Sequence, residues 1–235
     1  AGAGRKVVVI GAGVGGVELA LAMAERCAAE GPPAEITLVE RAARALPGIG
    51  TGARAALLAH LAARGIAVIT GCGVARLEHG AVLLEDGRRI GSDFTLSAAG
   101  ARPQGWLGGT GLTLREGFVA VGPTLQSIDD PAILAAGDCA HMTHAPRPRA
   151  GVFAVRQAPV LLHNLRALAS GGGRLRRYRP QRDYLKLVST GGKGAVADRH
   201  GLRLDGGLLW RLKDRIDRRF MARLNDLPPP QQQPA

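Results

Sequence analysis

The sequence predicts an α/β fold with a doubly wound parallel sheet. Two short runs rich in β-branched residues, Lys6 to Ile10 and Glu35 to Val39, have the pattern of buried strands. A glycine-rich turn at residues 11–16 separates the first run from a segment of helical composition at 17–29. Strands that alternate with helices in this way form parallel sheets.

The pattern continues along the chain in the order expected for such a sheet. A helix is expected at residues 50–64 and a third strand at 66–70. An antiparallel meander should follow, because the Asp86-Gly87 pair is a strong hairpin signal. The remaining expected elements are strands at 94–98, 118–121, 132–135, 184–188 and 195–197, and helices at 151–169 and 208–224.

These elements suggest four parts. We expect a dinucleotide-binding domain at residues 1–104, part of a second nucleotide-binding domain at 105–170, and a C-terminal cap with an amphipathic helix at 171–227. Residues 228–235, with the sequence PPPQQQPA, are of low complexity and are expected to be disordered.

Charge is distributed unevenly. Residues 1–144 hold 12 Lys and Arg against 13 Asp and Glu, whereas residues 145–235 hold 19 against 6. A basic C-terminal segment can contact nucleic acid, an anionic membrane, an acidic partner domain or only solvent. Aromatic residues make up only 3% of the chain and no RNA-binding motif is present, so we expect no nucleic-acid partner.

The three cysteines indicate a cytoplasmic protein. They are widely spaced and form no C-x-x-C pair, which argues against a disulfide framework and against a disulfide-reductase mechanism. Cys139, His141 and His144 offer three metal ligands, but too few ligands cluster there for us to expect a metal.

The turn at residues 11–16 fits the dinucleotide-binding pattern G-x-G-x-x-G. Gly11 would make the tight turn, Gly13 would let the backbone approach a pyrophosphate, and Gly16 would let helix and strand pack closely. Glu40 follows Gly16 by 24 residues, at the end of the second strand, where a carboxylate binds ribose hydroxyls and repels a 2′-phosphate. The pattern predicts a Rossmann-like domain that prefers NAD to NADP.

Two further stretches resemble the pyridine nucleotide-disulfide oxidoreductase superfamily. The stretch from Asp93 through Gly100 to Pro103 is similar to the crossover that ends a nucleotide domain in that family. The stretch AILAAGDCA, which contains Gly137 and Asp138, resembles its second FAD motif. The resemblance implies that Asp138 binds the ribityl chain of FAD.

The order of the motifs implies which dinucleotide each would bind. In this family the FAD glycine loop comes first and the NAD domain is inserted before the Gly-Asp motif. The single glycine loop here precedes Asp138 by 127 residues, and Glu18 just after it is similar to the NAD version. The resemblance therefore implies an NAD-binding loop at Gly11, and it implies that the FAD adenosine site lies in a segment before Ala1.

Two stretches resemble a narrower branch. GVFAVRQAP, with Gln157, is similar to the flavin-facing helix start of type II NADH dehydrogenase-like proteins. WRLKDRIDRRFM, from Trp210 to Met221, is similar to a branch fused to selenide, water dikinase. Gly122 and Ala99 depart from the family pattern, where an acidic residue and Thr are usual.

The resemblance implies an FAD-dependent NADH oxidoreductase in which hydride passes from NADH to the flavin. The electron acceptor is left open between a quinone, a selenium compound and a protein. An NAD-binding module without electron transfer, acting as the partner domain of a selenide, water dikinase, is the alternative. The helix at 208–224 carries an apolar stripe and many arginines, so it could dock on protein or lie peripherally on the inner membrane, and we favour docking.

Overall fold

The computed structural model describes residues 4–199 and 202–225. It divides the chain into two compact units. The first unit combines Ala1–Ala99 with Asp183–Ala235, and the second is Gly100–Arg182. Each unit is described by itself below.

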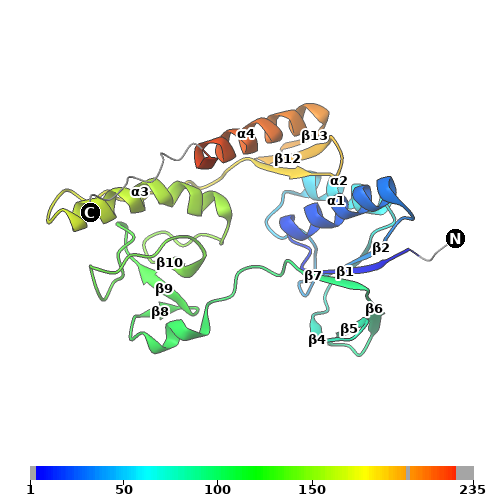
Figure 1. The fold of residues 1–235 in the computed structure, drawn as a ribbon, viewed down its shortest axis with the longest axis horizontal. Helices are drawn as coiled ribbons and strands as arrows, with labels where there is room; N and C mark the ends of the chain where they lie inside the picture. The colour runs from blue at the N-terminus through cyan, green and yellow to red at the C-terminus, as the bar shows by residue number, and fades with distance from the viewer. Residues whose placement is uncertain (1–3, 200–201, 226–235) are drawn as a thin grey trace, which may run out of the picture. The chain divides into compact units, whose positions relative to one another are not determined.

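The first unit is built on a parallel sheet. Its strands are β1 (Lys6–Ile10), β2 (Glu35–Val39), β3 (Ala67–Ile69) and β7 (Phe94–Ser97), in the order β3-β2-β1-β7. Helices α1 (Val14–Glu30) and α2 (Thr51–Ala63) connect the first three strands and cover one face of the sheet (Figure 1). The predicted α/β fold with a parallel sheet is confirmed.

The alternation of side chains along β1 explains why the sheet has two apolar faces. Val7 and Val9 pack into the cluster formed with α1 and α2. Val8 points the other way, into a cluster with Val82 and Leu84. Because residues on both faces of the sheet are buried, the sequence of β1 is a continuous apolar run rather than an alternation of apolar and polar residues.

An antiparallel meander covers the second face of the sheet. Its strands are β4 (Val74–Glu78), β5 (Ala81–Leu84) and β6 (Arg89–Gly91), joined in the order β4-β5-β6. The turn before β6 contains Gly87 with φ 87°. The Asp86-Gly87 pair predicted this meander. In a doubly wound sheet helices cover both faces, whereas here, in the described residues, the meander covers the second face.

The C-terminal part of the first unit adds a second layer over the helices. Strands β11 (Lys186–Ser189), β12 (Ala195–Arg199) and β13 (Leu202–Gly206) form an antiparallel sheet, here called the C-terminal sheet. It packs on α1 and α2, and α4 (Gly207–Asn225) packs on its other side (Figure 1). Val188 and Val196 join the core of α1 and α2.

The second unit consists of short elements around helix α3 (Gly151–Ala169). A three-stranded sheet has the order β10-β9-β8, with β8 Leu114–Arg115, β9 Phe118–Val121 and β10 Ala140–Met142. Two short 3-10 helices, η1 (Gly105–Gly109) and η2 (Gly137–Cys139), precede β8 and β10. The core of this unit includes Val119, Val121, Leu125 and Tyr178.

The structure corrects several expectations about the elements. Residues 132–135 were expected to form a strand, but only an isolated bridge joins Leu134 to Gln126. Strands β8, β10 and β13 were not foreseen. The two compact units divide the chain at 99/100 and 182/183, with residues 183–199 and 202–225 packed with the first unit, and the domain bounds at 104 and 170 stay a prediction. The predicted tail, 228–235, lies outside the described residues.

Candidate functional site

The glycine turn between β1 and α1 has the backbone geometry that the motif requires. Gly11 has φ 98°, and a Cβ at this position would come within 2.6 Å of the Ala98 carbonyl oxygen. A Cβ at Gly16 would meet the Gly11 carbonyl oxygen at 1.9 Å. Side chains are therefore excluded at Gly11 by conformation and contact, and at Gly16 by the close approach of helix and turn.

Gly13 differs from these two glycines because the space beside it is free. A Cβ there would have no protein atom within 4 Å. Gly13 is the N-cap of α1, no side chain caps this helix start, and its first turn carries no acidic residue. The first turn of α1 thus offers backbone N–H groups and the positive end of the helix dipole to an anion.

The peptide groups of Ala12 are fixed from two directions. The Ala12 N–H donates to Glu40 Oε2 at 2.8 Å. Its carbonyl oxygen accepts a hydrogen bond from the Leu46 N–H at 2.7 Å. Ala12 itself is fully buried. The conformation of the glycine turn is therefore set by residues that follow β2.

Glu40 lies at the predicted position, at the end of β2, and is held by two backbone groups. In addition to the Ala12 N–H, which donates to Oε2, the Ala42 N–H donates to Glu40 Oε1 at 2.9 Å. Each carboxylate oxygen can accept a second hydrogen bond. Glu40 can thus support the turn and still bind the hydroxyls of a ribose.

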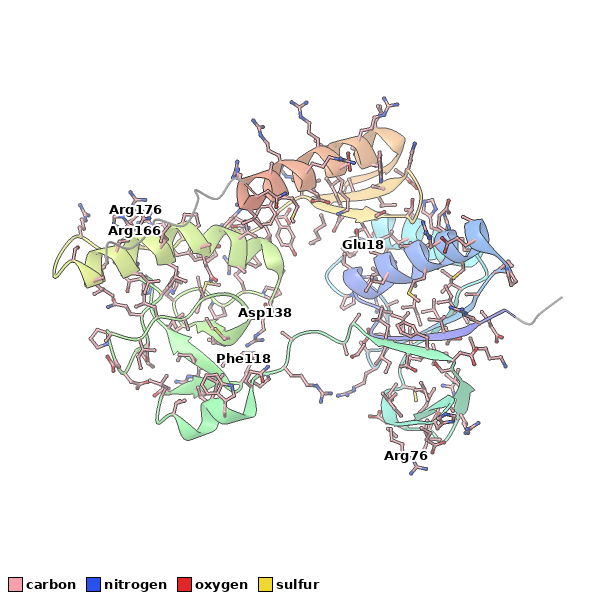
Figure 2. All side chains as sticks on the ribbon, in the orientation of Figure 1. Glu18, Arg76, Phe118, Asp138, Arg166 and Arg176 are labelled. Atoms are coloured by element: carbon pink, nitrogen blue, oxygen red, sulfur yellow. The ribbon has the colours of Figure 1, made fainter. Side chains whose placement is uncertain are left out.

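Glu18, just after the glycine turn, contacts the C-terminal part of the first unit. Its carboxylate accepts a hydrogen bond from the Ser189 N–H at 2.7 Å and lies 3.7 Å from the Lys213 ammonium. Partial burial acts to lower the pKa of Lys213, but the hydrogen bond to Asp217 and the charge of Glu18 outweigh it and raise that pKa. Glu18, labelled in Figure 2, thus ties α1 to the C-terminal sheet and to α4.

The second unit contains the Gly-Asp turn. Gly137 has φ 68° and begins η2. Asp138 follows in the same short helix, where its side chain is exposed (Figure 2). Gly100, the first residue of this unit, has φ 85° with no atom near its missing Cβ, so its conformation rather than close packing requires glycine.

Gln157, which the resemblance implies lies near the flavin, is buried beneath the Gly-Asp turn. Its side chain is 2% exposed, and its Oε1 accepts a hydrogen bond from the Gly137 N–H at 2.6 Å. Its Nε2 donates to Met142 Sδ at 3.2 Å. Gln157 therefore supports the Gly-Asp turn from α3 rather than presenting its amide to solvent.

Cys139 and His144, considered above as possible metal ligands, make hydrogen bonds to backbone carbonyl groups. His144 Nε2 lies 3.2 Å from the Tyr178 carbonyl oxygen, and Cys139 donates to the Ala136 carbonyl oxygen at 3.2 Å. Across the described residues, no three His, Cys, Asp or Glu side chains gather as metal ligands. None of the described helices is both long and apolar enough to cross a membrane.

Three contributors to the site were not identified from the sequence. Leu46 lies in an irregular segment and bonds to Ala12 through its backbone, which no side-chain pattern reveals. Asp198 and Lys186 reach the same segment from the C-terminal sheet. The sequence separation of 148 residues between Asp198 and Gly50 leaves no local signal for this contact.

Comparison with known proteins places this geometry in a family. A curated relative, the nitric oxide reductase FlRd-NAD(+) reductase of Aeromonas hydrophila, is 35% identical over 142 residues, which cover 57% of this chain and 34% of that protein. A solved FAD-dependent pyridine nucleotide-disulphide oxidoreductase from Desulfovibrio vulgaris is 27% identical, with a TM-score of 0.66 over 82% of this chain and 48% of the other.

A third similarity concerns the fold alone. The ferredoxin reductase for the CYP199A2 system from Rhodopseudomonas palustris is 24% identical, with a TM-score of 0.62 over 82% of this chain and 46% of the other. The chain thus spans about a third of the Aeromonas relative and about half of the two solved chains. The model of the pyridine nucleotide-disulphide oxidoreductase family matches residues 1–158, more than half of the chain. The chain therefore belongs to the pyridine nucleotide-disulphide oxidoreductase family.

Proposed function

We propose that this chain supplies the NADH-binding part, and part of the FAD-binding part, of an FAD-dependent NADH oxidoreductase. The observation that carries the proposal is the free space beside Gly13, next to the uncapped start of α1 and the fixed carboxylate of Glu40. This arrangement fits a pyrophosphate and an adjacent ribose. Family membership and the relatives named above support the same assignment.

Each group of the chain has a distinct role in this proposal. Backbone N–H groups of the first turn of α1 hold the pyrophosphate, and Glu40 accepts hydrogen bonds from the ribose. In the second unit Asp138 accepts hydrogen bonds from the ribityl hydroxyls of FAD, and Gln157 holds the turn that carries it. When both cofactors are bound, NADH supplies a hydride and the flavin accepts it. The electron acceptor is a redox protein, a quinone or a selenium compound.

A second candidate rests on α4. The helix carries exposed Leu212, Ile216 and Phe220, and its sequence resembles the branch fused to selenide, water dikinase. In this alternative the chain is an NAD-binding module that docks on a kinase domain without transferring electrons. The two candidates differ in whether the complete protein reduces an acceptor with NADH.

Gly13→Ala tests the binding site directly. The added Cβ meets no protein atom, and Gly13 has φ −71°, so the fold should tolerate alanine. The same Cβ enters the space proposed for the pyrophosphate. We expect the dissociation constant for NADH, measured by isothermal titration calorimetry, to rise roughly tenfold or more, about 1.4 kcal/mol or more.

Gly31→Ala is the matched control in the same unit. Gly31 lies at the other end of α1, and a Cβ there also meets no atom within 4 Å. We expect this variant to bind NADH like the unmodified protein. Unchanged NADH affinity in Gly13→Ala would refute the proposed site.

A further inference from the structure

The segment between β2 and α2 forms one side of the proposed dinucleotide site. We refer to residues 41–50 as the ribose loop. It contains no regular secondary structure. At the start of the loop the Ala42 N–H donates a hydrogen bond to the Glu40 carboxylate. In the middle of the loop the Leu46 N–H donates to the Ala12 carbonyl oxygen. The loop therefore reaches the glycine turn directly.

The conformation of the ribose loop is strained. Leu46 has φ 56°, a left-handed conformation that is unfavourable for a branched side chain. Its side chain is nevertheless fully buried among residues of α1 and α2. A strained residue persists only where its surroundings over-determine it, so the ends of this loop need firm anchors.

The anchor at the far end comes from the C-terminal sheet. Asp198 of β12, which is only 5% exposed, accepts a hydrogen bond from the Gly50 N–H through Oδ2 at 3.1 Å. Lys186 of β11 donates to the Gly48 carbonyl oxygen at 2.7 Å, and its ammonium lies 3.3 Å from the same Asp198 oxygen. One partly buried ion pair thus contacts the backbone of both Gly48 and Gly50 at the end of the loop.

We propose that Asp198 and Lys186 are positioning residues for dinucleotide binding, although they lie in the C-terminal sheet, outside the nucleotide-binding motif. They fix Gly48 and Gly50, which keep Leu46 in place against Ala12, and Ala12 in turn sets the glycine turn beside Glu40. The inference rests on the proposed function, because it names the residues that shape that site. It assigns to the C-terminal sheet control over the adenosine half of the dinucleotide.

A second contact between the same elements provides a matched control. Asp205 of β13 lies 3.0 Å from His60 Nε2, so it also joins the C-terminal sheet to α2. His60 lies near the C-terminal end of α2, away from the ribose loop. Removing this contact weakens the packing of the sheet on α2 without touching the connection to Ala12.

ADP-ribose is the appropriate probe because it contains the adenosine, both riboses and the pyrophosphate but no nicotinamide. For Asp198→Ala we expect its dissociation constant, measured by calorimetry, to rise roughly three- to tenfold. Asp198→Asn keeps an oxygen acceptor for the Gly50 N–H, so it should recover much of the affinity. Asp205→Ala should bind ADP-ribose like the unmodified protein. If Asp198→Ala fails to fold, Lys186→Met tests the same connection at Gly48.

A readout without ligand separates this inference from the proposed function. We expect hydrogen exchange of the Leu46 amide to become at least tenfold faster in Asp198→Ala and to stay unchanged in Asp205→Ala. If hydrogen exchange is faster in Asp198→Ala but the unmodified protein does not bind ADP-ribose, the proposed function is refuted while the role of Asp198 in holding the ribose loop stands. Unchanged exchange in Asp198→Ala, or equal losses of affinity in the Asp198 and Asp205 variants, would overturn the inference.

Discussion

The buried amide of Gln157 holds the backbone of Gly137, with 2.6 Å between Gln157 Oε1 and the Gly137 nitrogen. The glutamine comes from α3, 20 residues after the glycine. Because Gly137 has a left-handed conformation and leads directly to Asp138, this bond fixes the turn that presents the carboxylate. The Gly-Asp motif therefore depends on a side chain outside it.

Replacing Gln157 by leucine should destabilise the second unit. Leucine has a similar volume but leaves the Gly137 N–H without its acceptor, which costs about 1–3 kcal/mol. Urea denaturation measures the loss. Gln126→Leu is the control, since Gln126 donates an exposed hydrogen bond to the Pro131 carbonyl oxygen and accepts a partly buried one from the Thr124 hydroxyl, and it should cost less than Gln157→Leu. Equal losses in the two variants would contradict the buried role of Gln157.

NADH should bind more tightly than NADPH. The Glu40 carboxylate lies at the end of β2, where it would repel a 2′-phosphate by on the order of 1–3 kcal/mol. Glu40→Gln removes the charge but keeps an oxygen acceptor for only one of the two backbone N–H groups, so it should narrow the preference for NADH over NADPH at some cost in stability. Glu40→Ser should also narrow the preference for NADH, and it removes the hydrogen bond that holds the Ala12 N–H. Calorimetric titration with both nucleotides measures the ratio, and equal dissociation constants in the unmodified protein would refute the prediction.

The chain studied alone should bind NADH and hold FAD weakly. Its sequence contains one G-x-G-x-x-G turn and one Gly-Asp turn, whereas two complete dinucleotide sites need a glycine turn each. An absorbance spectrum of the purified protein tests this. Purification with stoichiometric bound flavin, visible as a yellow colour, would contradict the prediction.

Helix α4 should associate with protein rather than with a lipid bilayer. Its half-buried residues Leu209, Trp210 and Lys213 belong to a helix that already packs on the C-terminal sheet. Asp214 and Asp217 pair with Arg218 and Lys213, which dilutes the basic charge available to anionic lipid. We expect weak co-sedimentation with both anionic and neutral vesicles. Strong, salt-sensitive binding to anionic vesicles that Ile216→Asp abolishes, with circular dichroism unchanged, would reverse this view.

The sequence predicted the elements whose determinants are local. The β-branched run Lys6–Ile10, the Asp86-Gly87 turn and the helix Gly151–Ala169 all lie where their own residues indicate. The glycine turn was predictable because the conformation of Gly11 and the close packing at Gly16 each exclude other residues. In these cases composition and spacing alone decide the structure.

The features that the sequence did not predict depend on distant partners. Glu18 stands just after the glycine turn, but its carboxylate accepts a hydrogen bond from the Ser189 N–H, 171 residues away, which no local pattern predicts. Residues 132–135 have the composition of a strand, yet they form only one isolated β-bridge, between Leu134 and Gln126. A strand forms only where a neighbouring strand is available for pairing. The sequence predicted a C-terminal cap but not what it covers, and the burial of Val188 and Val196 in the core of α1 and α2 places the C-terminal sheet in the first unit.

The return of the chain to its first unit after the second has consequences for folding. Gly191 lies so close to α1 that a Cβ would come within 2.4 Å of the Leu21 carbonyl oxygen, so this contact forms only when helix and hairpin are both in place. On the ribosome, the outer face of α1 and α2 stays uncovered until more than 80 further residues have been made, since Gly100–Arg182 comes first. Contacts of such large sequence separation slow folding, because the entropy of closing the loop is lost before they form. The apolar face of the nascent first unit is therefore exposed to aggregation until the C-terminal sheet covers it.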